Sequence, residues 1–176
     1  GAINYTLTSG IPISGNSYTP VFSLISTDQF AIKLLTDLAI SVDTTYLSIL
    51  NGSLIDTANP ANLVLSTFLK ASNYTPDTTP PILIQFIANV NLSLLTLVFN
   101  EPVNTSSLNF TAFTLQSGNG PSASQYTLTG GYSPSPNGNL VDIHILPSDL
   151  NNVKEITTLF VSQASSFLSF ATGAVL

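Results

Sequence analysis

The chain has 176 residues, of which 44% are apolar and only 7% are charged, and its net charge at pH 7 is −6. Because three lysines are its only strong bases, it lacks the basic surface that nucleic-acid binding or a polybasic membrane patch requires. The absence of cysteine excludes disulfides and thiolate metal sites. Polarity comes instead from 23 Ser, 21 Thr and 16 Asn. Such a neutral surface predicts either attached glycan or association with other molecules.

The first part of the chain predicts short strands around one short helix. We expect strands over residues 6–8, 21–25, 45–50 and 63–69, the third of which ends at the turn Asn51-Gly52. Ser26-Thr27-Asp28 offers an N-cap, and the residues at 30, 33, 34, 37 and 38 suit the helix that it would begin. Because the chain starts at Gly1 without Met, we expect a processed product or a fragment of a longer protein.

A proline-rich segment, Asp77-Thr78-Thr79-Pro80-Pro81, separates the two parts of the chain. The prolines prevent a helix and favour extended backbone, so we expect a domain boundary between 1–76 and 77–176. The second part predicts strands over 82–87, 94–99, 113–116, 126–129, 141–146 and 167–170, with a helix from Pro147-Ser148-Asp149. Polar residues interrupt the apolar window 82–99, which predicts two strands and a turn rather than a membrane span.

An internal repeat organises the sequence. Tyr5-Thr6-Leu7-Thr8 recurs 121 residues later as Tyr126-Thr127-Leu128-Thr129, and the match continues without a gap to the end of the chain. Further pairs at this spacing are Asp28 with Asp149, Lys33 with Lys154 and Gly52 with Gly173. We interpret the pattern as a tandem duplication. Residues 1–76 are then the second half of a unit plus a linker, and residues 77–176 are a unit that lacks its last strand.

A strand that runs into a Glu-Pro-Val motif follows the proline-rich segment. Leu94, Thr96 and Val98 alternate with apolar residues and lead into Phe99-Asn100-Glu101-Pro102-Val103. This arrangement resembles the opening of bacterial Ig-like repeats, which are fibronectin-III- or cadherin-like β-sandwiches with a Phe-Ser-Glu-Pro-Val-Asp signature; Asn100 and Asn104 replace its Ser and Asp. The resemblance and the short, turn-rich strands predict an all-β fold of tandem Ig-like β-sandwich repeats, each with one short helix and the first incomplete. The resemblance also implies an extracellular array without catalytic residues.

The N-glycosylation pattern Asn-x-Ser/Thr occurs six times, at Asn4, Asn51, Asn73, Asn91, Asn104 and Asn109. We expect several of these asparagines to carry glycan, since four of them fall in or beside predicted turns and loops. The alternative is that they are ordinary turn asparagines. The segment Ser133-Pro134-Ser135-Pro136 could carry O-linked sugar, although a rigid loop is the better interpretation. No cofactor is expected.

The remaining candidates for chemistry favour structural roles. His144 is the only histidine and alternates with the apolar residues of its strand, so we interpret it as a solvated strand residue rather than part of a Ser-His-Asp triad. Asp28 and Asp149 each lie at a helix start, where they would stabilise the helix dipole; a calcium site is the minority alternative. Lys33 and Lys154 are expected on the helix surface, with a Lys–Asn isopeptide crosslink as the remote alternative.

Taken together, these features predict a non-enzymatic, extracellular or cell-surface structural protein. We expect a glycosylated fibre or stalk in which copies of the chain assemble head to tail, each donating a strand to the unpaired sheet edge of its neighbour. Residues 2–8 or 63–69 are the predicted donors. The alternative function is an adhesin or carbohydrate-binding module that uses the loop 130–139, with Tyr126 and Tyr132 stacking on sugar.

Overall fold

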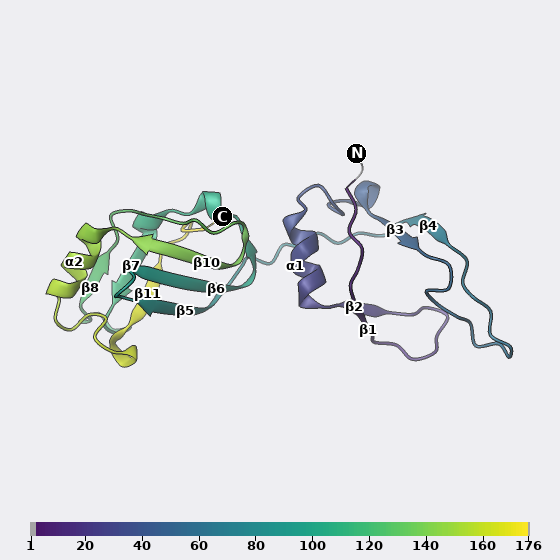
Figure 1. Ribbon diagram of the computed structural model, residues 1–176, viewed down its shortest axis with the longest axis horizontal. Helices are drawn as coiled ribbons and strands as arrows, with labels where there is room; N and C mark the ends of the chain where they lie inside the picture. Colours follow the sequence, from purple (N-terminus) through teal and green to yellow (C-terminus); the bar gives the residue numbers. More distant parts are fainter. Residues whose placement is uncertain (1–2, 176) are drawn as a thin grey trace. The chain divides into compact units, whose positions relative to one another are not determined.

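The computed structural model describes residues 3–175, and the chain divides into two units, Gly1–Thr79 and Pro80–Leu176 (Figure 1). Both are rich in β-strands arranged in small antiparallel sheets, and each contains one short α-helix. The expectation of a β-rich chain with short helices is therefore confirmed. Within the described residues, no helix has the length and apolar character needed to cross a membrane.

Unit 1 consists of two separate two-stranded antiparallel sheets and a helix. Strand β1 (Gly10–Pro12) pairs with β2 (Phe22–Leu24), and helix α1 (Ser26–Leu34) follows directly. Strand β3 (Tyr46–Ile49) pairs with β4 (Thr67–Lys70). The two sheets do not share a strand among the described residues, so neither presents more than a two-stranded surface.

Unit 2 contains two larger sheets. The first has the order β5-β6-β10-β9 and comprises β5 (Leu83–Asn89), β6 (Leu94–Val103), β10 (Gly138–Ile145) and β9 (Gly131–Tyr132). The second has the order β11-β7-β8 and comprises β11 (Phe167–Phe170), β7 (Phe113–Gln116) and β8 (Gln125–Thr127). Helix α2 (Pro147–Glu155) follows β10, as α1 follows β2 in unit 1.

The hydrophobic core lies in unit 2. Alternate residues of β6, such as Leu95, Leu97 and Phe99, are almost completely buried, and so are Val141 and Ile143 of β10. This period of two is what a strand with one face on a core requires. Every apolar side chain that is buried in the described part of the chain belongs to unit 2.

Elements of the two units recur at the spacing of 121 residues seen in the sequence. Helices α1 and α2, strands β3 and β11, and the 3-10 turns η1 (Val42–Thr44) and η4 (Gln163–Ser165) all obey it. The spacing extends to unusual backbone conformations. Ala39 and Phe160 have φ values of 52° and 55°, and Gly52 and Gly173 have values of 79° and 82°. Residues other than glycine rarely adopt a positive φ. A positive φ at equivalent positions of the two units therefore indicates that the backbone follows the same local path in both.

Several predicted boundaries are wrong for identifiable reasons. Residues 6–8 do not form a strand, because a side chain rather than a neighbouring strand bonds the amide of Thr8. The N-cap of α1 is Ile25, with no side-chain cap, since the Asp28 carboxylate bonds Thr8 and Tyr5 instead. Strand β6 extends to Val103, beyond the predicted 94–99, and β4 begins only at Thr67. The short strands β1 and β9 were not predicted, because two or three residues carry no detectable alternation.

Candidate functional site

A buried aspartate holds the same three types of donor in each unit. In unit 2, Asp149 accepts hydrogen bonds from the Tyr126 hydroxyl at 2.9 Å, the Thr129 hydroxyl at 2.7 Å and the Thr129 amide at 2.8 Å. In unit 1, Asp28 accepts from the Tyr5 hydroxyl at 2.8 Å and from the Thr8 hydroxyl at 2.7 Å and amide at 3.1 Å. Both aspartate side chains are fully buried. We call each set the aspartate clamp.

The clamps keep their carboxylates ionised. Burial raises the pKa of Asp149, but hydrogen bonds from Thr129 and Tyr126 outweigh it and hold the pKa below its usual value. Burial likewise opposes ionisation of Asp28, yet the bonds from Thr8 and Tyr5 lower its pKa. In turn, the hydrogen bond to Asp28 raises the pKa of the Tyr5 hydroxyl. Each oxygen of both carboxylates accepts at least one hydrogen bond from the protein, which favours a structural role for the two aspartates.

The helix-dipole interpretation of these aspartates is therefore incomplete. Asp28 and Asp149 do lie in the first turn of α1 and α2, where a negative charge is favourable. Their hydrogen bonds, however, reach back about 20 residues. They link α1 to residues 5–8 before β1 in unit 1, and α2 to β8 and the following Thr129 in unit 2. Nor do the described residues contain any group of three or more His, Cys, Asp or Glu that could hold a metal ion.

His144 and the two repeated lysines occupy structural positions. The His144 ring stacks on Tyr132 with the centroids 4.6 Å apart, while the neighbouring Asp142 accepts a hydrogen bond from the Thr96 hydroxyl at 2.6 Å. The Lys33 ammonium forms an ion pair with Asp77 at 2.6 Å, and Lys154 lies in the last turn of α2. The imidazole and Asp142 thus have separate partners rather than each other.

All six predicted glycosylation asparagines are exposed, namely Asn4, Asn51, Asn73, Asn91, Asn104 and Asn109. The side-chain oxygen of Asn104 accepts from the Ser106 hydroxyl at 2.7 Å and caps η2 (Thr105–Ser107). That of Asn109 accepts from the Thr111 hydroxyl at 2.8 Å and caps η3 (Phe110–Ala112). Both bonds are accepted by the side-chain oxygen. They do not involve the amide nitrogen, which is the atom that would carry an N-linked sugar.

Strand β3 pairs with β4 along one edge only. The Ala71 amide donates to the Thr45 carbonyl at 2.9 Å, and the register places Leu47 opposite Leu69. In an antiparallel ladder, alternate residues direct their backbone groups to the same neighbour. The backbone groups of Thr45, Leu47 and Ile49 therefore face β4, and those of Tyr46 and Ser48 face the opposite edge.

Strand β11, which corresponds to β3 at the spacing of 121 residues, is paired along the opposite edge. The Ala171 amide donates to the Ala112 carbonyl at 3.0 Å, and the register places Ser169 opposite Thr114. Thus Phe167, Ser169 and Ala171 face β7, and their counterparts in β3 are the residues that face away from β4. In each unit, one edge of β3 or β11 is paired with a neighbouring strand. The other edge has no partner strand among the described residues.

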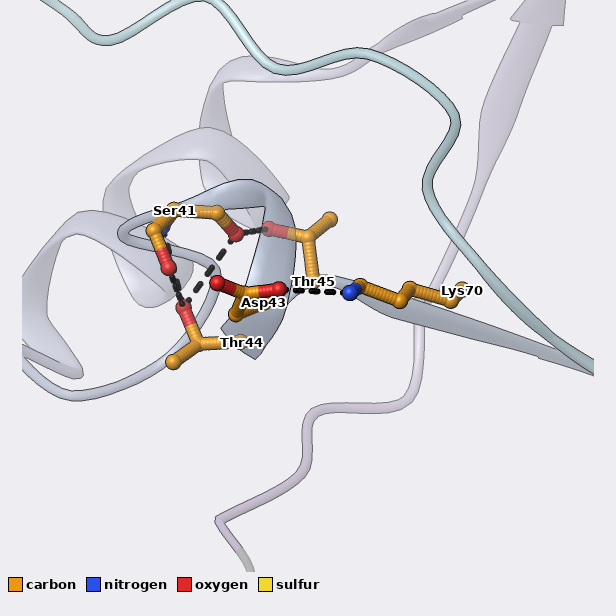
Figure 2. Close-up of polar contacts among 5 residues, drawn as sticks. All are labelled: Ser41, Asp43, Thr44, Thr45 and Lys70. Atoms are coloured by element: carbon orange, nitrogen blue, oxygen red, sulfur yellow. Dashed lines mark hydrogen bonds and ion pairs between the residues drawn. The ribbon is translucent and has the colours of Figure 1, made fainter.

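An ion pair reinforces the pairing of β4 in unit 1 (Figure 2). The Lys70 ammonium contacts the Asp43 carboxylate at 2.5 Å. Asp43 lies in η1, whose ends are joined by hydrogen bonds between Ser41 and Thr44. The hydrogen bond from Lys70 lowers the pKa of Asp43. At the corresponding position of η4 the sequence has Ala164, so unit 2 lacks this carboxylate.

The apolar face of unit 1 is open where the equivalent face of unit 2 is covered. Leu128 and Ile143 are 1% and 0% exposed, whereas their counterparts Leu7 and Phe22 are 44% and 49% exposed. In unit 2 the cover comes from β6 and β7, which pair with β10 and β11. The described part of unit 1 has no counterpart of these two strands. This open face and the unpaired edge of β3 form the candidate functional site of unit 1, and the unpaired edge of β11 forms that of unit 2.

Comparison with protein-family models, curated proteins and solved structures finds no match to this chain. The function must therefore be argued from the molecule itself. The sequence does not indicate which edge of β3 or of β11 lacks a partner strand among the described residues. The sequence difference between Asp43 and Ala164 is a signal of that asymmetry once the structure is known, since Asp43 bonds Lys70 of β4 and the described part of unit 2 has no strand at the position of β4.

Proposed function

We propose that the chain is a structural subunit of a glycosylated extracellular fibre or stalk, and that its two parts are copies of one Ig-like β-sandwich unit. The recurrence of helices, turns and positive-φ residues at one spacing supports the common unit. The subunits assemble head to tail by strand complementation, in which an extended segment of one molecule pairs with the open sheet edge of the next. Because such contacts do not close on themselves, they generate a filament.

The observation that carries this proposal is the open face and edge of unit 1. Phe22 and Leu7 are about half exposed at positions where unit 2 buries its core. Exposed apolar surface beside an unpaired sheet edge is an association site in soluble β-proteins. The low charge of the chain, at 7% of residues, provides little repulsion against association.

The exposed asparagines support glycosylation as the source of solubility. All six acceptor positions are accessible, and Asn104 and Asn109 bond through the oxygen rather than the nitrogen. Residues 63–69 are not available as donor in the way that the sequence predicted, because β4 already pairs with β3 of its own unit. Of the other predicted donor, residues 2–8, Ala2 lies outside the described residues, and Tyr5 and Thr8 are bound to Asp28.

The alternative of a carbohydrate-binding module has less support. Its two proposed stacking rings were Tyr126 and Tyr132. The Tyr126 hydroxyl bonds Asp149 and also accepts a hydrogen bond from the Asn152 amide at 2.9 Å, which makes this residue part of the clamp. Only Tyr132 is exposed, and its ring already stacks on His144.

The test is to image native material by negative-stain microscopy and to weigh it intact before and after enzymatic deglycosylation. We expect fibres and a mass above 18.5 kDa that falls on deglycosylation. The control is the same chain produced without glycosylation machinery, which should still form fibres if strand pairing drives assembly. Dispersed particles at high concentration in light scattering, together with an unmodified mass, would contradict the proposal.

A further inference from the structure

Asparagine followed by glycine occurs three times in the chain, at Asn51-Gly52, Asn119-Gly120 and Asn137-Gly138. This dipeptide is chemically labile, because glycine has no side chain to hinder the approach of its backbone nitrogen to the preceding asparagine. All three asparagines are exposed, so water reaches each of them. The three sites contain the same reacting groups and differ in the hydrogen bonds that surround them.

The reaction of such a pair is deamidation, and it needs only water as a second reactant. The glycine nitrogen loses its proton and attacks the side-chain carbonyl carbon of the asparagine. A C–N bond forms there, and the side-chain amide leaves as ammonia. Water then opens the cyclic imide at one of its two carbonyls, which yields aspartate or isoaspartate. Both products have a carboxylate, which is ionised at pH 7, in place of a neutral amide.

Asn119-Gly120 lies at the tip of the loop between β7 and β8, above the bonds that close the loop. The Ser117 amide donates to the Ser124 carbonyl at 2.9 Å, and the Gly120 carbonyl accepts from the Ala123 amide at 3.0 Å. Among the described residues, however, neither the Asn119 side chain nor the Gly120 amide has a hydrogen-bond partner. No atom beyond the chain neighbours lies within 4 Å of where a Cβ of Gly120 would be. The nitrogen can therefore approach the side chain without breaking a bond.

At Asn51-Gly52 the attacking nitrogen is held. The Gly52 amide donates to the Val64 carbonyl at 3.0 Å. A Cβ on Gly52 would lie 3.8 Å from the Leu63 side chain, so the segment that accepts this bond also packs against the turn. The bond must break before the nitrogen can attack. The net contribution of one hydrogen bond corresponds to a slowing of about tenfold.

At Asn137-Gly138 both reacting groups are held. The Asn137 side-chain oxygen accepts from the Thr105 amide at 3.0 Å and from the Thr105 hydroxyl at 3.1 Å. Gly138 is the first residue of β10 and pairs opposite Val103 of β6. The two donors polarise the side-chain carbonyl, which favours attack. Even so, the carbonyl carbon cannot meet the nitrogen until this end of β10 opens.

We propose that Asn119 is a site of spontaneous deamidation, and that the hydrogen bonds at Gly52 and Asn137 protect the other two pairs. The fold thus selects one of three chemically equivalent sites. Each event adds one negative charge to a chain whose net charge is −6 and whose charged residues are only 7% of the total. The loop between β7 and β8 therefore becomes more acidic as the protein ages. The proposal depends on neither fibre assembly nor glycosylation.

The first test follows the three sites in the folded chain over time. The full chain is produced without glycosylation machinery, so that Asn51 carries no sugar, and is incubated in mildly alkaline buffer at physiological temperature. Peptide mass spectrometry measures the conversion of each asparagine and separates aspartate from isoaspartate. We expect conversion of Asn119 to be at least about tenfold faster than that of Asn51 or Asn137. The rate should rise with pH, because the glycine nitrogen must lose its proton.

Two controls separate the local sequence from the fold. In concentrated urea the hydrogen bonds of the folded chain are lost, so the three sites should react at similar rates. The variant Gly120→Ala has space for its methyl group and should fold normally. It should slow the conversion of Asn119 by roughly tenfold, because the side chain hinders the attacking nitrogen. Conversion of Asn51 and Asn137 should not change in this variant.

The result that would overturn the proposal is specific. Conversion of Asn51 or Asn137 that equals or exceeds that of Asn119 in the folded chain would show that these hydrogen bonds do not protect. A preference for Asn119 that persists unchanged in urea would show that the local sequence, rather than the fold, selects the site. Because these measurements use unglycosylated chain and count no fibres, neither result bears on the proposed assembly.

Discussion

Units 1 and 2 have the same local framework but bury very different amounts of it. Both contain the aspartate clamp, a nine-residue helix and a positive-φ residue after it. Yet Ile143 is 0% exposed and its counterpart Phe22 is 49% exposed. The comparison teaches that the clamp and helix are specified locally, by hydrogen bonds within some 20 residues. Burial requires the strands that face them, and among the described residues these strands lie in unit 2.

The largest expected effect comes from truncating an apolar side chain that is buried in unit 2 and half exposed at the equivalent position of unit 1. Ile143→Ala should lower the free energy of unfolding of unit 2 by about 2–5 kcal/mol, because it leaves a cavity in the hydrophobic core to which β6 and β10 contribute. Phe22→Ala, at the same position of unit 1, should cost less than about 1 kcal/mol, since its side chain is half exposed. Amide hydrogen exchange measures each unit separately. Similar losses from both substitutions would show that the face of unit 1 is covered in solution.

The next effect concerns the clamp. Asp149→Asn keeps the shape of the side chain but turns an amide towards donors that need an acceptor, and it should destabilise unit 2 by about 1–3 kcal/mol. Asp28→Asn should act in the same direction on unit 1, since its donors are the same. The control is Asp37→Asn at an exposed position beyond α1. Urea unfolding measures the change in the free energy of unfolding of each variant. No change for Asp149→Asn would show that the clamp does not stabilise unit 2.

Acid should weaken both units through the same carboxylates. The pKa values of Asp28 and Asp149 are lowered in the folded chain. Their contribution to stability is therefore complete above the unfolded value of about 3.9 and is lost as the pH falls through the lower folded value. Urea midpoints of unfolding should be measured from about pH 6 to about pH 2, which brackets the unfolded pKa. They should fall towards the acid end of this range. The Asp149→Asn variant should show a shallower decline in unit 2, and an unchanged slope would contradict this origin.

The two units also differ in how far the sequence predicts them. Strands 113–116 and 167–170 were predicted with their correct ends, because apolar residues alternate between clear turns. The repeated Asp28 and Asp149 were identified, but their partners were not. A carboxylate that bonds a threonine 20 residues earlier leaves no periodic trace in the sequence. Likewise, which edge of β3 or β11 is open depends on hydrogen-bond alternation, and residue type does not encode it.

The smallest expected effect tests why β4 remains on β3. Asp43→Asn removes the ion pair with Lys70. The Asp43 side chain is 78% exposed and the Lys70 side chain is 45% exposed. Because exposed pairs contribute little, hydrogen exchange of the β4 amides should rise by no more than about fivefold. The difference from the native chain should disappear at high salt. In unit 2 the equivalent Ala164 has no charge, so exchange in β11 should not depend on salt. A salt dependence of equal size in both strands would mean that general screening, rather than this pair, holds β4 in place.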